Sequence, residues 1–284
     1  MNNPFEVEQL KRLQPSQFIK TCLANKLRTD GRTLHQSRPI HSHSDVISSA
    51  HASTIVSIGN TSVLCAIKFE TAQPESAKPN QGFLVPNVEL GPMCCPKYKP
   101  GPPPDQAQIL APNSKTSSSP RGSCRWNSLV IAPGKLVWVV YIDIVCLSND
   151  GNLFDASLSA TTSALKSARI PVVSFDHETQ SLKLANPTHP ESVPLAIRTS
   201  ISGYTFALYD RSTILPDPCL FEEDSAAGSV TLVVDDDSRD LVHLSFAAPS
   251  PSPDSDSPSP LSCPAVLDAC FKIIHANSRP SSRA

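Results

Sequence analysis

The chain of 284 residues has little glycine, few aromatic side chains and almost no net charge. Only 10 glycines stand against 28 prolines, so proline should mark most breaks between secondary-structure elements. Lys and Arg number 24 and Asp and Glu 26, which gives a net charge of -2 at pH 7. The protein therefore has no overall positive charge that would attract nucleic acid or acidic lipid, and any contact with nucleic acid must be local.

Long apolar segments are also missing. The longest apolar run ends at Leu147, is interrupted by Asp143 and is shorter than the roughly 20 residues that span a bilayer. The first residues, MNNPFEVEQLKRLQ, are charged where a secretion signal needs an apolar core. Cysteines are odd in number and irregularly spaced, which is typical of reduced thiols. These absences predict a soluble intracellular protein with no membrane partner.

Apolar periodicity predicts helices and strands in mixed order, and hence an α+β fold. Spacings of three and four predict one amphipathic helix over 5–26. Gly59-Asn60 predicts a hairpin of strands 48–57 and 61–70, whereas the proline-rich residues 71–128 are expected to be irregular. Further strands are expected at 136–147, 193–201, 203–209, 228–235 and 240–246, and further helices from 154 to before Pro171 and over 264–277.

Several motifs follow one another in an order that resembles the RNase PH family, over about residues 5–275. They are RTDGR at 28–32, SIGNTSVLCAIKFE, GFLVPNVELGPMC, GPPPDQAQ, APGKLVWVVYIDIVCLSNDGNLFDASLSATTSALK and ILPDPCLFEED. More narrowly, they resemble the non-catalytic branch of ring subunits in the eukaryotic RNA exosome. The resemblance implies an RNase PH-like fold built from β-α-β-α lobes of the ribosomal protein S5 domain 2 type.

This resemblance also implies a division of the chain. A first lobe is expected over 28–192 and a second lobe over 193–284. The apolar spacing places an N-terminal helix within 1–27, and the low-complexity stretch AAPSPSPDSDSPSP predicts a disordered loop at about 247–262. Residues 105–130 are rich in Ser and Pro where the family has a regular helix. They are either a lineage-specific loop or a fault in the gene model, and both alternatives stay open.

Active members of this family degrade RNA from its 3′ end by phosphorolysis, which needs a held phosphate, cations along the RNA and a carboxylate. Their A-D-G-G-T-R stretch is matched here by NDGNLF, so Leu153 and Phe154 stand in place of the phosphate-binding Thr-Arg pair. In EEDSAAGSV, Val230 stands in place of the second family Asp. The resemblance therefore implies no catalytic residue, no cofactor and no metal.

An RNA contact is nevertheless predicted at Lys97, Tyr98 and Lys99, where active relatives carry an arginine-rich clamp. The stretch KYKPGPPPDQAQIL has lysines but no arginine, and lysine lacks the bidentate fork that grips phosphate. If prolines keep the backbone extended, both lysines face one side and Tyr98 offers a stacking surface. The alternative, a solvated loop with two surface lysines, stays open.

Other polar clusters have structural interpretations. The carboxylates of residues 222–224 are interpreted as a solvated acidic loop, and Asp30-Gly31-Arg32 as a turn with a surface arginine. Asp143 is expected to make a structural hydrogen bond within its apolar strand. Adjacent Cys94 and Cys95 do not have the spacing of a zinc site, even with the histidines at 41 and 43.

We expect a catalytically inactive, structural subunit of the exosome core ring that supports 3′-5′ RNA processing, including that of rRNA, and RNA degradation. The implied partners are other RNase PH-like subunits in a six-membered ring, S1/KH cap proteins, a hydrolytic exoribonuclease and RNA in the central channel. The implied location is the nucleus and nucleolus, and also the cytoplasm. Two alternatives stay open, namely an active phosphorolytic 3′-5′ exoribonuclease and a free-standing RNA-binding module.

Overall fold

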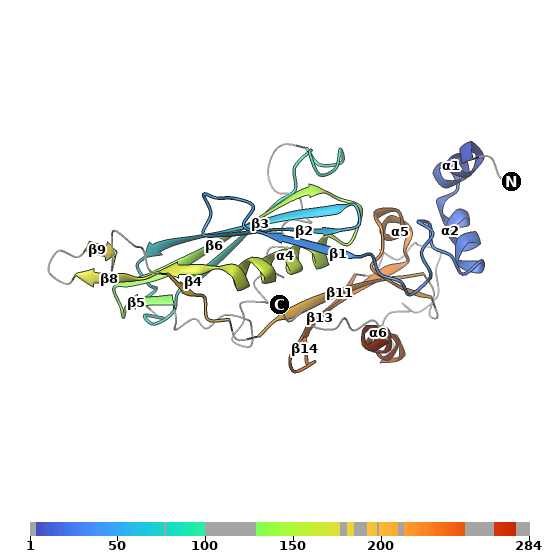
Figure 1. Cartoon of the computed structure of the whole chain (residues 1–284). Coiled ribbons are helices and arrows are strands. Elements are labelled where there is room, and N and C mark those ends of the chain that lie inside the picture. Colours follow the sequence, from blue (N-terminus) through green and yellow to red (C-terminus); the bar gives the residue numbers. More distant parts are fainter. Residues whose placement is uncertain are drawn as a thin grey trace.

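The computed structural model contains two main β-sheets with a helix between them (Figure 1). It describes residues 4–76, 78–99, 129–176, 181–184, 192–197, 199–209, 213–247 and 264–276. Helices and strands alternate irregularly along the chain, so the predicted α+β class is confirmed. None of the helices described is long and apolar enough to cross a membrane.

The first sheet is built on a long hairpin, as the Gly59-Asn60 turn predicts. Side chains of β3 (Thr61–Ala72) alternate between buried and partly exposed, because successive residues of a strand face opposite sides. All neighbouring strands pair antiparallel except β4, which is parallel to β6. The order is β1 (Ile40–Ser44), β2 (Ala52–Ile58), β3, β6 (Leu136–Ser148) and β4 (Phe83–Glu89), with β5 (Val130–Ala132) also on β6.

Strand β4 corrects the prediction that residues 71–128 are irregular. Pro86 lies within β4, opposite Ile142 of β6. Proline cannot donate a ladder hydrogen bond, but an edge strand tolerates it, and β4 is at the edge of the sheet. On the neighbouring strand, Asp143 accepts a hydrogen bond from Asn87 Nδ2 at 3.3 Å, in agreement with its predicted structural role.

Helix α4 (Leu153–Ser167) lies between the two sheets. Its small residues Ala156, Ala160 and Ala164 pack into the core of the first sheet, where their size lets the helix approach closely. Leu158 instead joins a cluster with residues of the second sheet. The helix predicted from 154 to before Pro171 is therefore confirmed, and it connects the two cores.

The second sheet is antiparallel and is covered by α4 on one face and α6 on the other. Side chains of α6 that recur every four residues, Val266, Cys270 and Ile274, are buried against it. Its order is β12 (Ile214–Pro216), β11 (Ile201–Leu208), β13 (Gly228–Asp235) and β14 (Leu241–Ala247), and α6 spans Pro264–Ala276.

The strand predicted at 193–201 is wrong. The chain forms only a short β10 (Ser192–Pro194) there, and β11 begins at Ile201. Pro194 has no amide with which to continue the ladder. Two small pairs complete the strands, β10 with β7 (Arg169–Pro171) and β8 (Val173–Asp176) with β9 (Ser181–Leu184).

The single helix predicted over 5–26 is also wrong, because two helices take its place. They are α1 (Pro4–Leu13) and α2 (Pro15–Ala24). Between them Gln14 has φ -138° and ψ 65°, since the residue before a proline is driven out of the helical region. Helix α2 rests on α5 (Leu220–Ser225) through an edge-to-face contact of Phe18 with Phe221, 6.2 Å between ring centres.

The boundaries of the two predicted lobes, at 28–192 and 193–284, stay predictions. Residues 248–262 of the predicted disordered loop lie outside the described residues. Residues 105–128 of the Ser- and Pro-rich segment also lie outside them.

Candidate functional site

The turn between β6 and α4 is the centre of the candidate site. Gly151 and Asn152 both have left-handed backbones, with φ of 81° and 56°. A Cβ atom at position 151 would lie 2.4 Å from the backbone carbon of Cys219 and from the backbone nitrogen of Leu220, so only glycine fits. Asn tolerates this conformation better than most residues. The sequence NDGN thus forms a tight turn that brings the start of α4 against the start of α5.

A carboxylate from α5 already binds the start of α4. The backbone N–H of Asn152 donates to Glu223 Oε1 at 2.7 Å. The pKa of Glu223 is raised to about 7, mainly by burial and also by the charge of Asp155, while that hydrogen bond acts in the opposite direction. Amides at a helix start attract anions, and here the anion belongs to the chain itself.

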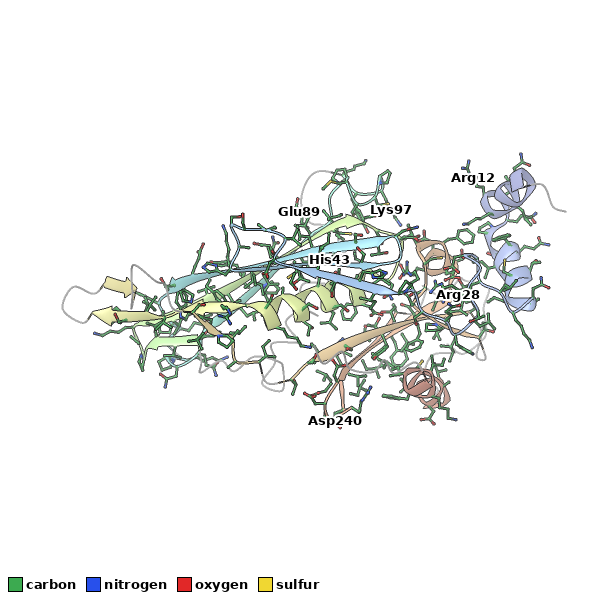
Figure 2. The ribbon with its side chains drawn as sticks, in the orientation of Figure 1. Arg12, Arg28, His43, Glu89, Lys97 and Asp240 are labelled. Atoms are coloured by element: carbon green, nitrogen blue, oxygen red, sulfur yellow. The ribbon has the colours of Figure 1, made fainter. Side chains whose placement is uncertain are left out.

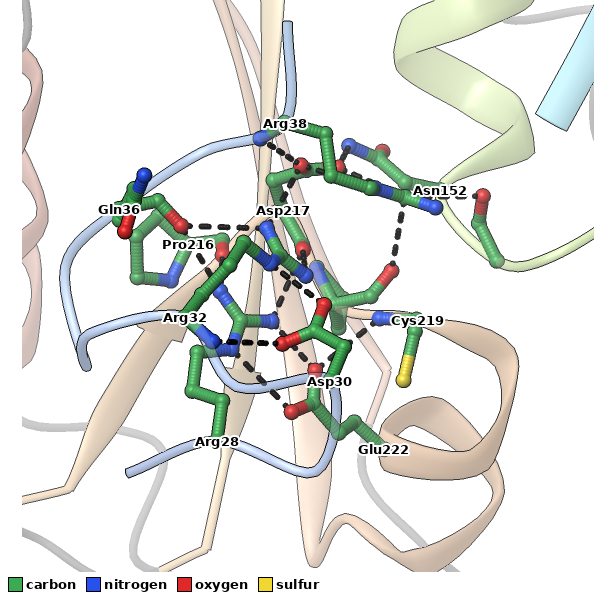
Figure 3. Close-up of polar contacts among 12 residues, drawn as sticks. Arg28, Asp30, Arg32, Gln36, Arg38, Asn152, Pro216, Asp217, Cys219 and Glu222 are labelled. Carbon is green, nitrogen blue, oxygen red and sulfur yellow. Dashed lines mark hydrogen bonds and ion pairs between the residues drawn. The ribbon is translucent and has the colours of Figure 1, made fainter. Parts of the chain in front are cut away.

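An arginine cluster joins the segment before β1 to the segment between β12 and α5 (Figure 3). We define it as Arg28, Arg32, Arg38, Asp217 and Glu222. Arg28 pairs with Glu222, and both side chains are almost fully buried, at 0% and 1% exposure. Arg32 Nη1 and Arg38 Nη2 donate to the two oxygens of Asp217 at 3.0 and 2.8 Å. Each buried charge in this cluster therefore has an opposite charge beside it, as burial requires.

Arg38 also fixes the turn before α4. Its guanidinium donates to the carbonyl oxygens of Asp150, Gly151 and Pro218 at 2.9, 3.3 and 3.3 Å. One arginine thus holds the end of β6 and the start of α5 together. A guanidinium that donates to three carbonyls and a carboxylate has no pair of N–H groups left to bind a diffusible anion.

Two sequence interpretations are wrong at this cluster. Residues 222–224 do not form a solvated loop, because they lie in α5 with Glu222 buried, and only Asp224 is exposed. Arg32 is not a surface arginine, since its side chain is 11% exposed and is paired with Asp30 and Asp217. Arg28, the partner of Glu222, and Asp217, a partner of Arg32, lie far from them in the sequence. Asp30 reaches Arg32 through a tight turn. Local composition does not reveal these contacts.

The resemblance predicts three positions, 153, 154 and 230, at which an apolar residue replaces a site residue of the family. The structure places two of them, 153 and 154, at the start of α4. Leu153 is half-buried against the core of the first sheet, and Phe154 packs on the cluster of Leu158 and Ile201. Val230 is fully buried in the core between β13 and α6. It therefore faces away from α4, and a side chain there does not approach the turn. The assignment of these residues as vacated catalytic positions stays a prediction from the resemblance.

The predicted RNA-contact residues lie in the loop that follows β4. Lys97 and Lys99 are exposed, and Lys97 Nζ lies 3.9 Å from Asp224 Oδ1 of α5 (Figure 2). The backbone is not extended at Lys97, because Tyr98 N–H closes a turn by donating to the Cys95 carbonyl at 3.1 Å. The side chain of Tyr98 is half-buried against the first core, so the two lysines carry the prediction.

Sequence reasoning missed Asp155, Asp217 and the arginines at 28 and 38. Asp155 is buried in α4 and accepts hydrogen bonds from the N–H and hydroxyl of Thr205, both at 2.9 Å. The one signal in the sequence for a structural role of Asp155 is its place among small and apolar residues of a predicted helix. Within the described part of the chain, no three His, Cys, Asp or Glu side chains are arranged to hold a metal ion.

Comparisons with known proteins place the chain in a family. Residues 36–171 match the RNase PH model, described as the 3′ exoribonuclease family, domain 1. The chain is 33% identical over 224 residues to the exosome complex component rrp43 of Schizosaccharomyces pombe. This match covers 79% of this chain and 82% of that protein. It is 35% identical over 222 residues to the exosome complex component Rrp42 of Pyrococcus furiosus, with 77% of each covered.

The fold agrees with a solved structure of the same kind. A chain of the Archaeoglobus fulgidus exosome, solved with RNA bound to the active site, superposes with a TM-score of 0.76 at 24% identity. The match covers 91% of this chain and 92% of that chain, so the α+β fold described above is the RNase PH-like fold. The chain belongs to the RNase PH family, and its similar relatives there are exosome components.

Proposed function

We propose that this protein is a structural subunit of the RNA exosome core ring that supports 3′-5′ RNA processing and degradation without catalysing either. Its relatives in S. pombe and P. furiosus are named exosome complex components. Its partners in this proposal are other RNase PH-like subunits in a six-membered ring, S1/KH cap proteins, a hydrolytic exoribonuclease and RNA in the channel. It acts in the nucleus and nucleolus and in the cytoplasm.

Among the residues that the structure describes, no cation is available at the turn before α4, and this supports the proposed lack of catalysis. Phosphorolysis needs a phosphate held by positive or hydrogen-bonding side chains. At positions 153 and 154 the side chains are apolar and packed, and the N–H of Asn152 is bound to Glu223. Arg38, which touches the turn, is bound to Asp217 and to carbonyl groups. A carboxylate at this place repels phosphate rather than binding it.

The test is a phosphorolysis assay of the purified chain with RNA and inorganic phosphate, in which we expect no nucleoside diphosphates. Restoring one cation by Phe154→Arg should not help, because Glu223 still occupies the amide and catalytic groups act as a unit. An active phosphorolytic relative, assayed in parallel, is the positive control. Phosphate-dependent release of nucleoside diphosphates by the unmodified protein would establish the alternative, an active exoribonuclease.

A further inference from the structure

Three carboxyl groups from different parts of the chain meet at Asn152, where α4 contacts α5. The Nδ2 of Asn152 donates to Asp217 Oδ1 at 2.7 Å (Figure 3), and its backbone N–H donates to Glu223 Oε1 at 2.7 Å. Its side chain also hydrogen-bonds the carboxyl group of Asp155, three residues further along α4. Negative charges so close together in a buried place repel each other unless cations or protons compensate them.

Of these three carboxyl groups, only that of Asp217 is paired with cations. Arg32 Nη1 and Arg38 Nη2 lie 3.0 and 2.8 Å from its two oxygens. In the part of the chain that the structure describes, no ion pair includes Asp155 or Glu223. Asp217 is therefore compensated by charge, whereas the other two carboxyl groups depend on hydrogen bonds alone.

Asp155 is enclosed by uncharged groups of the second sheet. Its side chain accepts from the N–H and the hydroxyl of Thr205 in β11, both at 2.9 Å, and the residue is 7% exposed. Glu223 lies on the other side of Asn152 and is half-buried. Neither carboxyl group is thus surrounded by enough water to screen its charge from the other.

The other charged groups that face the two carboxyl groups are mostly negative. The pKa of Asp155 is raised to about 6, mainly by burial and also by the charge of Asp217. The pKa of Glu223 is raised to about 7, mainly by burial and also by the charges of Asp155 and Asp224, while Arg38 lowers it. The hydrogen bonds to both groups act in the opposite direction. Protons therefore compensate here for the missing cations.

We propose that Asp155 and Glu223 form a proton-sharing carboxyl pair that makes the contact between α4 and α5 sensitive to pH near neutrality. While the pair holds a proton, one of its members is neutral and the two groups do not repel each other. Above neutral pH both ionise, and the repulsion between them weakens the contact. This inference goes beyond the assembly role, because it concerns a proton equilibrium inside the chain, whether or not the chain enters a ring.

The structure supplies one backbone reporter for each carboxyl group. The Thr205 N–H donates to Asp155, and the Asn152 N–H donates to Glu223, so each amide proton resonance follows the protonation of its own acceptor. The experiment records both resonances of the full chain between pH 4 and 9 in wild type, Asp155→Asn and Glu223→Gln. We expect the titration seen at Asn152 to move to lower pH by about one pH unit in Asp155→Asn, and that seen at Thr205 to move likewise in Glu223→Gln.

The matched control is Asp224→Asn, which removes an exposed carboxylate beside Glu223 and should move the Asn152 titration much less. Unchanged titrations in both variants, or resonances that do not shift with pH in wild type, would overturn the proposal. If only one variant folds, it decides alone, because the coupling between two sites is reciprocal. If neither folds, the wild-type curves decide, since a coupled pair titrates in two steps seen by both reporters, and independent groups each titrate in one step.

Discussion

Replacing Asp217 by Asn is the sharpest test of the arginine cluster. Asp217 accepts hydrogen bonds from Arg38 Nε and Nη2, from Arg32 Nη1 and from Asn152 Nδ2, at 2.7–3.0 Å. It also accepts from the backbone N–H of Arg38 at 2.7 Å, and it is 6% exposed. An amide has one acceptor oxygen and no charge, so Asp217→Asn removes both the ion pairs and part of the hydrogen bonding.

The magnitude follows from the pKa of Asp217. Burial alone would raise this pKa, but the hydrogen bonds and charge of Arg38, together with Asn152, lower it from the ordinary 3.8 to about 2. One pKa unit corresponds to about 1.4 kcal/mol, so the ionised form contributes about 2–3 kcal/mol to the free energy of folding at pH 7. Because the folded pKa is depressed, this contribution is complete above 3.8 and is lost as the pH falls through about 2. Leaving Arg38 buried without its carboxylate adds to the loss.

The assay is urea unfolding of wild type and Asp217→Asn, followed by far-UV circular dichroism at pH 7 and in steps down to about pH 3. We expect the variant to lose about 2–4 kcal/mol at pH 7 and the difference to shrink as the pH approaches 3. The control is Asp237→Asn at the exposed β13–β14 turn, which should change stability by less than about 0.5 kcal/mol. A loss below about 1 kcal/mol at pH 7, or a loss independent of pH, would refute the reasoning.

Four further predictions follow from the same structure. Glu223→Gln should match wild type near pH 4 and exceed its unfolding free energy by about 1–3 kcal/mol near pH 8, because a carboxyl with a raised pKa loses stability as the pH rises from 4.5 through about 7. Gly151→Ala should cost more than about 2 kcal/mol in urea unfolding, through its φ of 81° and its contact with the backbone of α5. Lys97→Glu combined with Lys99→Glu should leave assembly intact and reduce RNA crosslinking in a reconstituted complex, with the loss shrinking as salt rises; unchanged crosslinking at low salt would remove this loop as an RNA contact. The chain should be soluble when co-expressed with another RNase PH-like subunit and aggregate alone, since Leu13 and Met93 are 79% and 73% exposed; a monodisperse monomer would contradict this.

The elements that the sequence predicts correctly are those with strong local signals. The β2–β3 hairpin follows from Gly59-Asn60, and the buried face of α4 follows from alanines spaced by four. Local signals also explain the errors. Pro86 indicated a break, but proline is compatible with an edge strand, and whether a strand is at the edge depends on the whole sheet.

The candidate site was much less predictable, because its contacts join distant parts of the chain. Arg28 and Glu222 are 194 residues apart, and Arg38 and Asp217 are 179 apart. Neither arginine is in a motif that indicates a buried partner. The apolar residues at 153 and 154 led to the prediction that the Thr-Arg pair of the family is missing, but only the folded chain shows that Glu223 binds at the same turn.

The turn before α4 keeps its shape for reasons that do not involve phosphate. Gly151 is required because the backbone of residues 219–220 lies against it, and Arg38 holds the carbonyls on both sides of this contact. The side chains at 153 and 154 point into the two cores and take no part in these contacts. Chemistry at those positions can therefore be lost without disturbing the backbone, while loss of Gly151 or Arg38 would separate α4 from α5. The contacts that join α4 to α5 therefore depend on the backbone at position 151 and on Arg38, and not on the side chains at 153 and 154, as the proposed assembly role requires.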